Sequence, residues 1–140
     1  MIKLQGIKKT IRAFKKIEKN LNDPSKVMKT IAQMGVKDVD AHFRNESGPN
    51  GKWETLDKDR SRKRDKGGDL ILNDSGTLKR SIRGSVQKKA AVVSTNIKYA
   101  DFHQHQNKKY SRPPQRKFLW ISDKASKLMA KILGKFIVKV

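Results

Sequence analysis

Residues 71–96 read ILNDSGTLKRSIRGSVQKKAAVVSTN, and this stretch predicts the β-hairpin on which the fold is built. The sequence NDSG at 73–76 is typical of a turn, in which glycine supplies a positive φ. Apolar and polar residues then alternate from 78 to 87, which favours a half-buried strand. Two lysines at 88–89 should turn the chain, so that residues 91–96 become the antiparallel partner.

Both ends of the chain have the periodicity of amphipathic helices. Apolar residues recur every three or four positions along 4–21 and 27–43, with a break at Pro24 that suits the start of a second helix. Two helices joined by so short a turn should pack as an antiparallel pair. A third apolar stripe follows a cap at Ser122 or Asp123. The sequence therefore predicts an α+β fold, with an N-terminal helix pair and a C-terminal helix packed on a small antiparallel β-sheet.

A long basic loop is expected between the helix pair and the hairpin. Residues 46–69 lack periodicity, and 58–66 contain six Lys or Arg residues and two Asp residues. Loops of this length are usually functional or flexible. Trp53 and Leu56 should pin its first part to the body. We expect a single domain, 1–140, made of a helical pair (1–45), an extended basic loop (46–69), a sheet with a short helix (70–121) and a C-terminal helix (122–140).

Charge is the strongest global feature of the sequence. The 140 residues include 34 Lys and Arg against 13 Asp and Glu, a net charge of +21. Such a charge attracts DNA, RNA or acidic protein surfaces. The lack of cysteine excludes disulfides and thiolate metal sites. No apolar run approaches the roughly 20 residues that cross a bilayer, and the first residues lack the apolar block of a signal peptide. We expect no membrane partner.

Residues 99–120, YADFHQHQNKKYSRPPQRKFLW, contain the best candidates for a chemical site. His103 and His105 lie two residues apart with Asp101 nearby, but a tetrahedral metal site needs three or four ligands. The remaining histidine, His42, lies on a distant helix, where we expect it to be a packing residue. Neither a nucleophile elbow nor a phosphate-binding glycine loop is present. A histidine-metal enzyme is left open as an alternative, and we predict no catalytic residue, cofactor or metal.

Nucleic-acid binding is a second alternative. The lysines of the first helix, the 58–66 tip and the basic stretch 108–117 could neutralise phosphates, while Trp53, Tyr110 and Trp120 could stack on bases. For the two tryptophans, core packing is the favoured interpretation. Because no base-reading motif is present, this alternative is a cytoplasmic protein that binds nucleic acid without sequence specificity.

A series of short motifs occurs in a fixed order between residues 43 and 122. They are Phe43, PNGKW at 49–53 with Leu56, ILNDSGTLKRSI at 71–82, VVSTN at 92–96, YADFHQ at 99–104 and PPQRKFLWIS at 113–122. In this order they resemble the phage virion morphogenesis family, the tail-completion or head–tail joining proteins of Mu-like contractile-tailed phages. The chain differs from the family pattern at His105–Asn107, where a glycine commonly follows the His-Gln pair, and at Trp120, where glycine is also common.

The resemblance implies a structural virion protein rather than an enzyme. It would act at the neck or upper tail, completing the tail or joining it to the head, after assembly in the host cytoplasm. Such proteins usually work as rings, and sixfold symmetry would match a tail tube, so a homohexamer is expected. The expected partners are tail terminator, connector or adaptor subunits, with phage DNA close by. Cationic segments would set encounter rate and register against acidic partner surfaces.

The candidate interface residues are cationic side chains of the two basic segments together with aromatic anchors. They are Trp53, Arg60, Arg62, Lys63, Arg64, Lys108, Lys109, Arg112, Arg116 and Phe118. Arg116 is expected to clamp a carboxylate, within the subunit or across an interface.

Four further residues are expected to shape the family motifs. Gly76 should adopt a positive φ and Leu78 should enter the core. Tyr99, with Phe102, should pack a short helix onto the sheet, and His103 should tie the following loop to the body.

Overall fold

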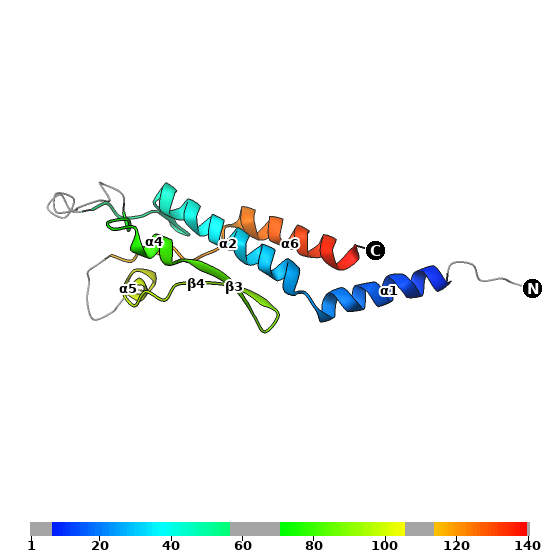
Figure 1. Ribbon diagram of the computed structural model, residues 1–140. Coiled ribbons are helices and arrows are strands. Elements are labelled where there is room, and N and C mark those ends of the chain that lie inside the picture. The colour runs from blue at the N-terminus through cyan, green and yellow to red at the C-terminus, as the bar shows by residue number, and fades with distance from the viewer. Residues whose placement is uncertain (1–6, 57–70, 106–113, 140) are drawn as a thin grey trace, which may run out of the picture.

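Helix α2 (Ser25–Asn45) is the axis of the fold (Figure 1). One side of it packs on a hairpin formed by β3 (Arg83–Gln87) and β4 (Ala90–Ser94), and it also contacts α6 (Asp123–Val138). The computed structural model describes residues 7–56, 71–105 and 114–139. Within these ranges, helices lie at both ends of the chain and small antiparallel sheets lie between them, which confirms the predicted α+β class.

The predicted hairpin is present, with a later start than expected. Strands β3 and β4 pair antiparallel from Arg83 opposite Ser94 to Gln87 opposite Ala90. The two turn lysines, Lys88 and Lys89, both have positive φ, 47° and 64°, as a two-residue hairpin turn requires.

The first half of the predicted strand is instead helix α4 (Thr77–Ser81). Leu78 and Ile82 are four residues apart, a spacing that places both on one side of a helical turn, and both are buried there. The prediction of a strand from residue 78 was therefore wrong, and extended structure begins at Arg83.

Two glycines let α2 and the hairpin approach closely. A Cβ atom on Gly35 of α2 would lie 2.6 Å from Cγ2 of Val93, and one on Gly84 of β3 would lie 2.8 Å from the carbonyl oxygen of Ala32. Any larger residue would therefore push the helix and the hairpin apart.

Helix α1 (Ile7–Asn22) does not fold back on α2, so the predicted antiparallel helix pair is wrong. It extends the long axis of the molecule and ends at the side of α6, where the side-chain amide of Asn20 donates to the carbonyl oxygen of Phe136 at 2.8 Å (Figure 1). The short link at Asp23 and Pro24 continues the direction of the chain instead of reversing it.

The first part of the predicted basic loop is a tight hairpin. Strands β1 (Ser47–Gly48) and β2 (Gly51–Lys52) pair antiparallel, and Trp53 follows directly. Residues 57–70 lie outside the described ranges.

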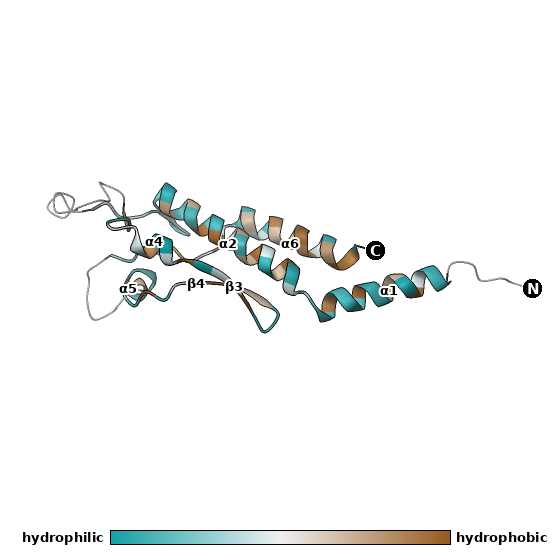
Figure 2. Cartoon of the chain, viewed as in Figure 1, coloured by the Kyte–Doolittle hydropathy of each residue, from teal (hydrophilic) through white to brown (hydrophobic). Residues whose placement is uncertain are grey.

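The core gathers around one end of α2. Its buried hydrophobic residues come from five segments of the chain: Val39, Phe43, Trp53, Ile71, Leu78, Ile82, Ala100 and Phe118. At the start of α6, Ser122 is the predicted cap, because its hydroxyl accepts from the backbone nitrogen of Ala125 at 3.2 Å. Figure 2 shows hydrophobic residues also along α1 and α6, away from this core.

Candidate protein-interaction site

The described residues that flank the two basic segments, called their stems, lie together at one end of the molecule. Residues 56 and 71 flank the first segment, residues 105 and 114 flank the second, and all of them lie at the end opposite α1 (Figure 1). The sequence predicted both segments as interaction elements but gave no indication that their stems share a site.

Glu46 holds the two sides of the first segment together. It follows α2 with a left-handed φ of 49°, and its carbonyl oxygen accepts from the backbone nitrogen of Trp53 at 2.7 Å. Its carboxylate accepts from the backbone nitrogen of Ile71 at 2.6 Å. The chain therefore leaves and returns at nearly the same point. Sequence reasoning missed this role of Glu46, which no local pattern signals.

Arg116 joins the second segment to the first. Its side chain is buried, and its Nε and Nη2 atoms donate to the carbonyl oxygen of Glu54 at 3.1 and 2.9 Å. Its backbone nitrogen also donates to the carbonyl oxygen of His103 at 2.9 Å. Two N–H groups of the planar guanidinium thus converge on one carbonyl oxygen, and Nη2 also lies 3.4 Å from the carbonyl oxygen of Thr55. These bonds go to backbone carbonyl groups of the same subunit, and the carboxylate clamp expected of Arg116 stays a prediction.

Gln104 fixes the backbone of Phe118 and Leu119, shortly after Arg116. Its side-chain nitrogen donates to the carbonyl oxygen of Leu119 at 2.8 Å. Its side-chain oxygen accepts from the backbone nitrogens of Phe118 and Leu119 at 3.2 and 3.0 Å. One amide thereby satisfies three backbone groups, and this residue supplies most of the tie that was expected from His103.

His103 lies half-buried beside Arg116. Burial lowers the pKa of its imidazole below the usual value, and the neighbouring guanidinium lowers that pKa further. Its Nδ1 atom is buried and meets no hydrogen-bond partner among the described residues. The neutral form of the ring is therefore favoured, and its backbone carbonyl makes the contact to the loop.

The two aromatic interface candidates lie in the core. Phe118 is fully buried and Trp53 is 6% exposed. The ring of Phe43 packs against both, with centroid distances of 5.4 Å to Phe118 and 5.8 Å to Trp53. The indole nitrogen of Trp53 donates to the carbonyl oxygen of Lys117 at 3.0 Å. These side chains support the stems from inside.

The short helix α5 (Ala100–Gln104) packs differently from the prediction. Tyr99 and Phe102 were expected to pack on the sheet, but they are 45% and 50% exposed. Ala100 is the buried residue instead, because on a single helical turn only one side can face the body. The expectations for Gly76 and Leu78 are confirmed: Gly76 has a φ of +73° and Leu78 is buried.

The remaining interface candidates fall outside the described ranges. They are Arg60, Arg62, Lys63 and Arg64 in the first segment and Lys108, Lys109 and Arg112 in the second.

A second polar cluster ties α6 to α2. The Asp38 carboxylate accepts from the backbone nitrogen and the hydroxyl of Ser122, both at 2.7 Å. His42 is buried, stacks on Trp120 at a centroid distance of 4.1 Å, and lies 3.5 Å from Asp38. It is the packing histidine that the sequence predicted, stacked on the residue that departs from the family pattern.

This cluster is not built for nucleophilic catalysis. In a catalytic triad the histidine stands between serine and aspartate and takes the serine proton. Here the Ser122 hydroxyl donates to Asp38, so the aspartate stands in the middle. The described residues also contain no group of three potential metal ligands, and His105 pairs with Asp101 at the surface at 2.7 Å.

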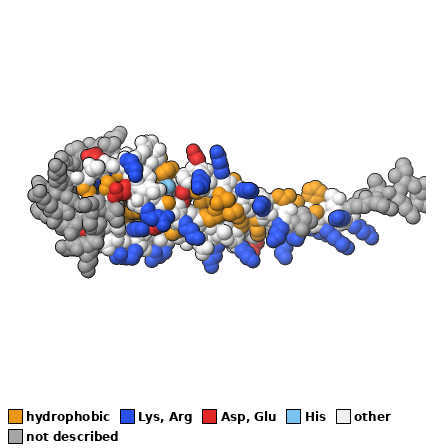
Figure 3. Space-filling view, turned by 90° about the horizontal axis from the view of Figure 1, so that it is seen from above, with side chains coloured by type: hydrophobic (Ala, Val, Ile, Leu, Met, Phe, Trp, Pro, Cys, Tyr) orange, Lys and Arg blue, Asp and Glu red, His pale blue; other side chains and the backbone are white. Residues whose placement is uncertain are grey.

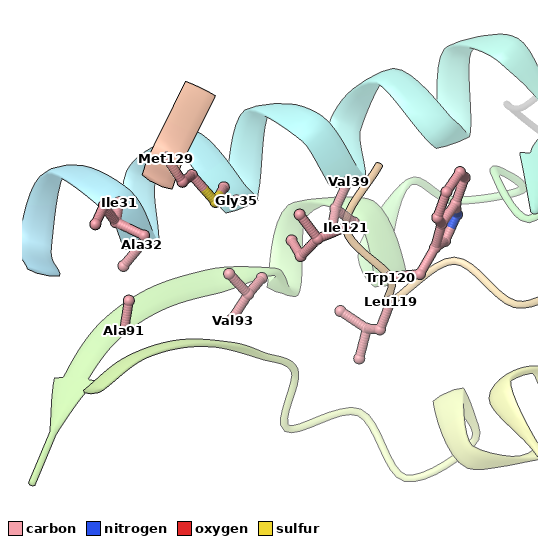
Figure 4. A pocket seen from close by; sticks show the side chains of 10 residues that line it. All are labelled: Ile31, Ala32, Gly35, Val39, Ala91, Val93, Leu119, Trp120, Ile121 and Met129. Carbon is pink, nitrogen blue, oxygen red and sulfur yellow. The ribbon is translucent and has the colours of Figure 1, made fainter. Parts of the chain in front are cut away.

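A cavity of about 230 Å³ lies between α2, β4 and α6 (Figure 4). Its lining is almost entirely hydrophobic: Ile31, Ala32, Gly35, Val39, Ala91, Val93, Leu119, Trp120, Ile121 and Met129. Such a lining offers no set of convergent polar groups for a reaction. None of the described helices is both long and apolar enough to span a membrane.

The polar contacts of Glu46, Gln104 and Arg116 hold the stems of the basic segments in place. Such an arrangement is typical of proteins that act by binding. The chain belongs to the phage virion morphogenesis family, whose model matches residues 4–137. No curated protein and no solved structure shows a significant match. The family match confirms the resemblance to this family read from the sequence motifs, and it indicates a structural phage virion protein.

Proposed function

We propose that this virion protein acts at the neck or upper tail, where it completes the tail or joins it to the head. It would do so as a subunit of a ring, for which the symmetry of a tail tube suggests six copies. Its partners would be tail terminator, connector or adaptor subunits. It would be made in the host cytoplasm and retained in the particle, with phage DNA passing close by.

One observation carries this proposal: the stems of the two basic segments are held together at one end of the molecule. Glu46, Arg116 and Gln104 fix the backbone on both sides of these segments. A loop with fixed ends loses less conformational entropy when it docks. Cations on such loops favour encounter with acidic partner surfaces.

The elongated shape also suits a ring subunit. The basic stems lie at one end and α1 projects from the other (Figure 1). A subunit with different surfaces at its two ends can make head-to-tail contacts, which close into a ring when the rotation allows it.

Deleting the gene from a phage that carries it tests the proposal. Electron microscopy of the lysate should show full heads and tails that are not joined, or tails without a finished upper end. Restoring the wild-type gene in trans should restore joined particles. Normal infectious particles from the deletion strain would contradict the proposal.

A second candidate function is nucleic-acid binding, and the observation that supports it is the net charge of +21. That candidate predicts a monomer or dimer that binds duplex DNA at low salt and loses the DNA steeply as salt rises. A protein found at one collar position in particles would exclude it as the main role.

A further inference from the structure

Helices α1 and α6 carry an apolar face that no other described part of the chain covers. On α1, Ile11, Phe14 and Leu21 are 48%, 66% and 53% exposed. On α6, Leu128 is 50% exposed, and no described residue of this helix is buried. Large hydrophobic side chains in such numbers on neighbouring helices are typical of an interface.

The shape of this face suits the binding of another helix. Along α1, a hollow of about 470 Å³ is lined by Ile11, Phe14, Lys15, Ile17, Glu18, Leu21 and Asn22. Figure 3 shows hydrophobic side chains that run from α6 onto α1, bordered by Lys and Arg side chains. Ridges and grooves of this kind accept the side chains of another helix.

The charge around the face indicates the chemistry of its occupant. Helix α1 carries six Lys or Arg residues and one Glu, and α6 carries four Lys and one Asp. A second copy of the same face would oppose these cations with like charges. Duplex DNA would pair with the cations but would leave the apolar stripe exposed to water.

We propose that this face, called the α1–α6 face, docks an acidic amphipathic helix of another virion protein. The apolar side of that helix would cover Phe14, Leu21 and Leu128, and its carboxylates would pair with the bordering lysines such as Lys15. The identity of the partner as a neck or tail protein depends on the proposed function, but the chemistry of the face does not.

Binding of defined peptides to the full-length protein tests this inference. The probe is a fluorescent peptide of about 18 residues, five helical turns, with leucines at helical spacing and glutamates elsewhere. One control peptide has the same composition in scrambled order, and a second has lysines in place of the glutamates. Fluorescence anisotropy should show binding of the ordered acidic peptide only, weakened when salt rises from about 0.05 to 0.5 M.

Matched variants locate the binding on the protein. Phe14→Ala should weaken binding at least about tenfold, as expected for an anchoring aromatic residue. Phe102→Ala removes a phenylalanine that is also exposed, 50% against 66% for Phe14, but lies at the opposite end of the molecule, and it should leave binding unchanged. Lys15→Glu should weaken binding more at low salt than at high salt. Circular dichroism and melting curves should be the same for all variants, since each residue is exposed.

Four outcomes would overturn the inference. Equal binding of the scrambled peptide would show that charge alone acts, and equal loss with Phe102→Ala would place the site elsewhere. Concentration-dependent self-association that Phe14→Ala abolishes would assign the face to a second copy of this chain. Binding to phosphatidylglycerol vesicles without binding to the acidic peptide would assign it to a membrane surface.

Peptide binding that persists while the deletion strain makes normal particles would refute the proposed function and keep this inference.

Discussion

Replacing Gln104 by alanine should be among the most damaging single changes in the stem region. The side-chain amide satisfies two backbone N–H groups and one carbonyl of Phe118 and Leu119. A buried polar group left unsatisfied costs about 1–3 kcal/mol. A hollow of about 210 Å³ beside Gln104, Phe118 and Leu119 could admit water and recover part of this cost. We therefore expect Gln104→Ala to lower the free energy of unfolding by about 2–4 kcal/mol.

Urea denaturation followed by circular dichroism measures this loss, with a linear extrapolation and an unchanged slope m. Gln115→Ala is the matched control, because Gln115 is exposed and its side-chain nitrogen donates to the carbonyl oxygen of Gln104 at 3.0 Å. That control should cost about 0.5 kcal/mol or less. If Gln104→Ala costs no more than its control, the side-chain amide of Gln104 does not fix the backbone of Phe118 and Leu119.

Two further predictions concern packing and pH. Gly84→Ala should destabilise the protein by about 1–3 kcal/mol, because its Cβ would lie 2.8 Å from the carbonyl oxygen of Ala32. Gly134→Ala in α6 is the control: its Cβ would meet no atom within 4 Å, and it should stabilise the protein by about 0.5–1 kcal/mol. Equal thermal denaturation midpoints of the two variants would contradict this packing of α2 on the hairpin. The folded-state pKa of His103 is lowered below 6.5, first by burial and then by Arg116, so the unfolded chain binds the proton more readily and stability should fall as pH drops through about 6.5. His103→Gln should flatten this fall between about pH 7.5 and 5.5 in urea denaturation, and an unchanged pH profile would contradict it.

The sequence was most informative where the signal is local. The hairpin followed from polar alternation and a two-lysine turn, and the start of α6 followed from the capping serine Ser122. A cap or a turn is decided by a few adjacent residues, so distant parts of the chain have little influence on it.

The strand predicted at Leu78 failed because a short segment can satisfy two periodicities. Leu78, Ile82 and Val86 are four residues apart, and in so short a run that spacing fits both one turn of helix and alternate positions of a strand. The segment forms a helical turn before the strand begins, because this conformation buries both Leu78 and Ile82 in the core.

The orientation of α1 and the shared stem site could not have been read from the sequence. An apolar stripe shows that a helix face will be covered but does not say by what. The contacts of Gln104 with Leu119 and of Arg116 with Glu54 join residues far apart in the chain, through side chains whose types are common in any loop. Such pairings depend on the tertiary fold, and only the structure brings them together.

An electron cryomicroscopy map of the particle neck would show whether this protein forms part of the junction between head and tail. The map should contain a ring at the junction of head and tail into which α2, the β3–β4 hairpin and α6 fit, with the stems of the basic segments facing a neighbouring protein. Particles whose neck and upper tail contain no density for this fold would contradict the proposed function.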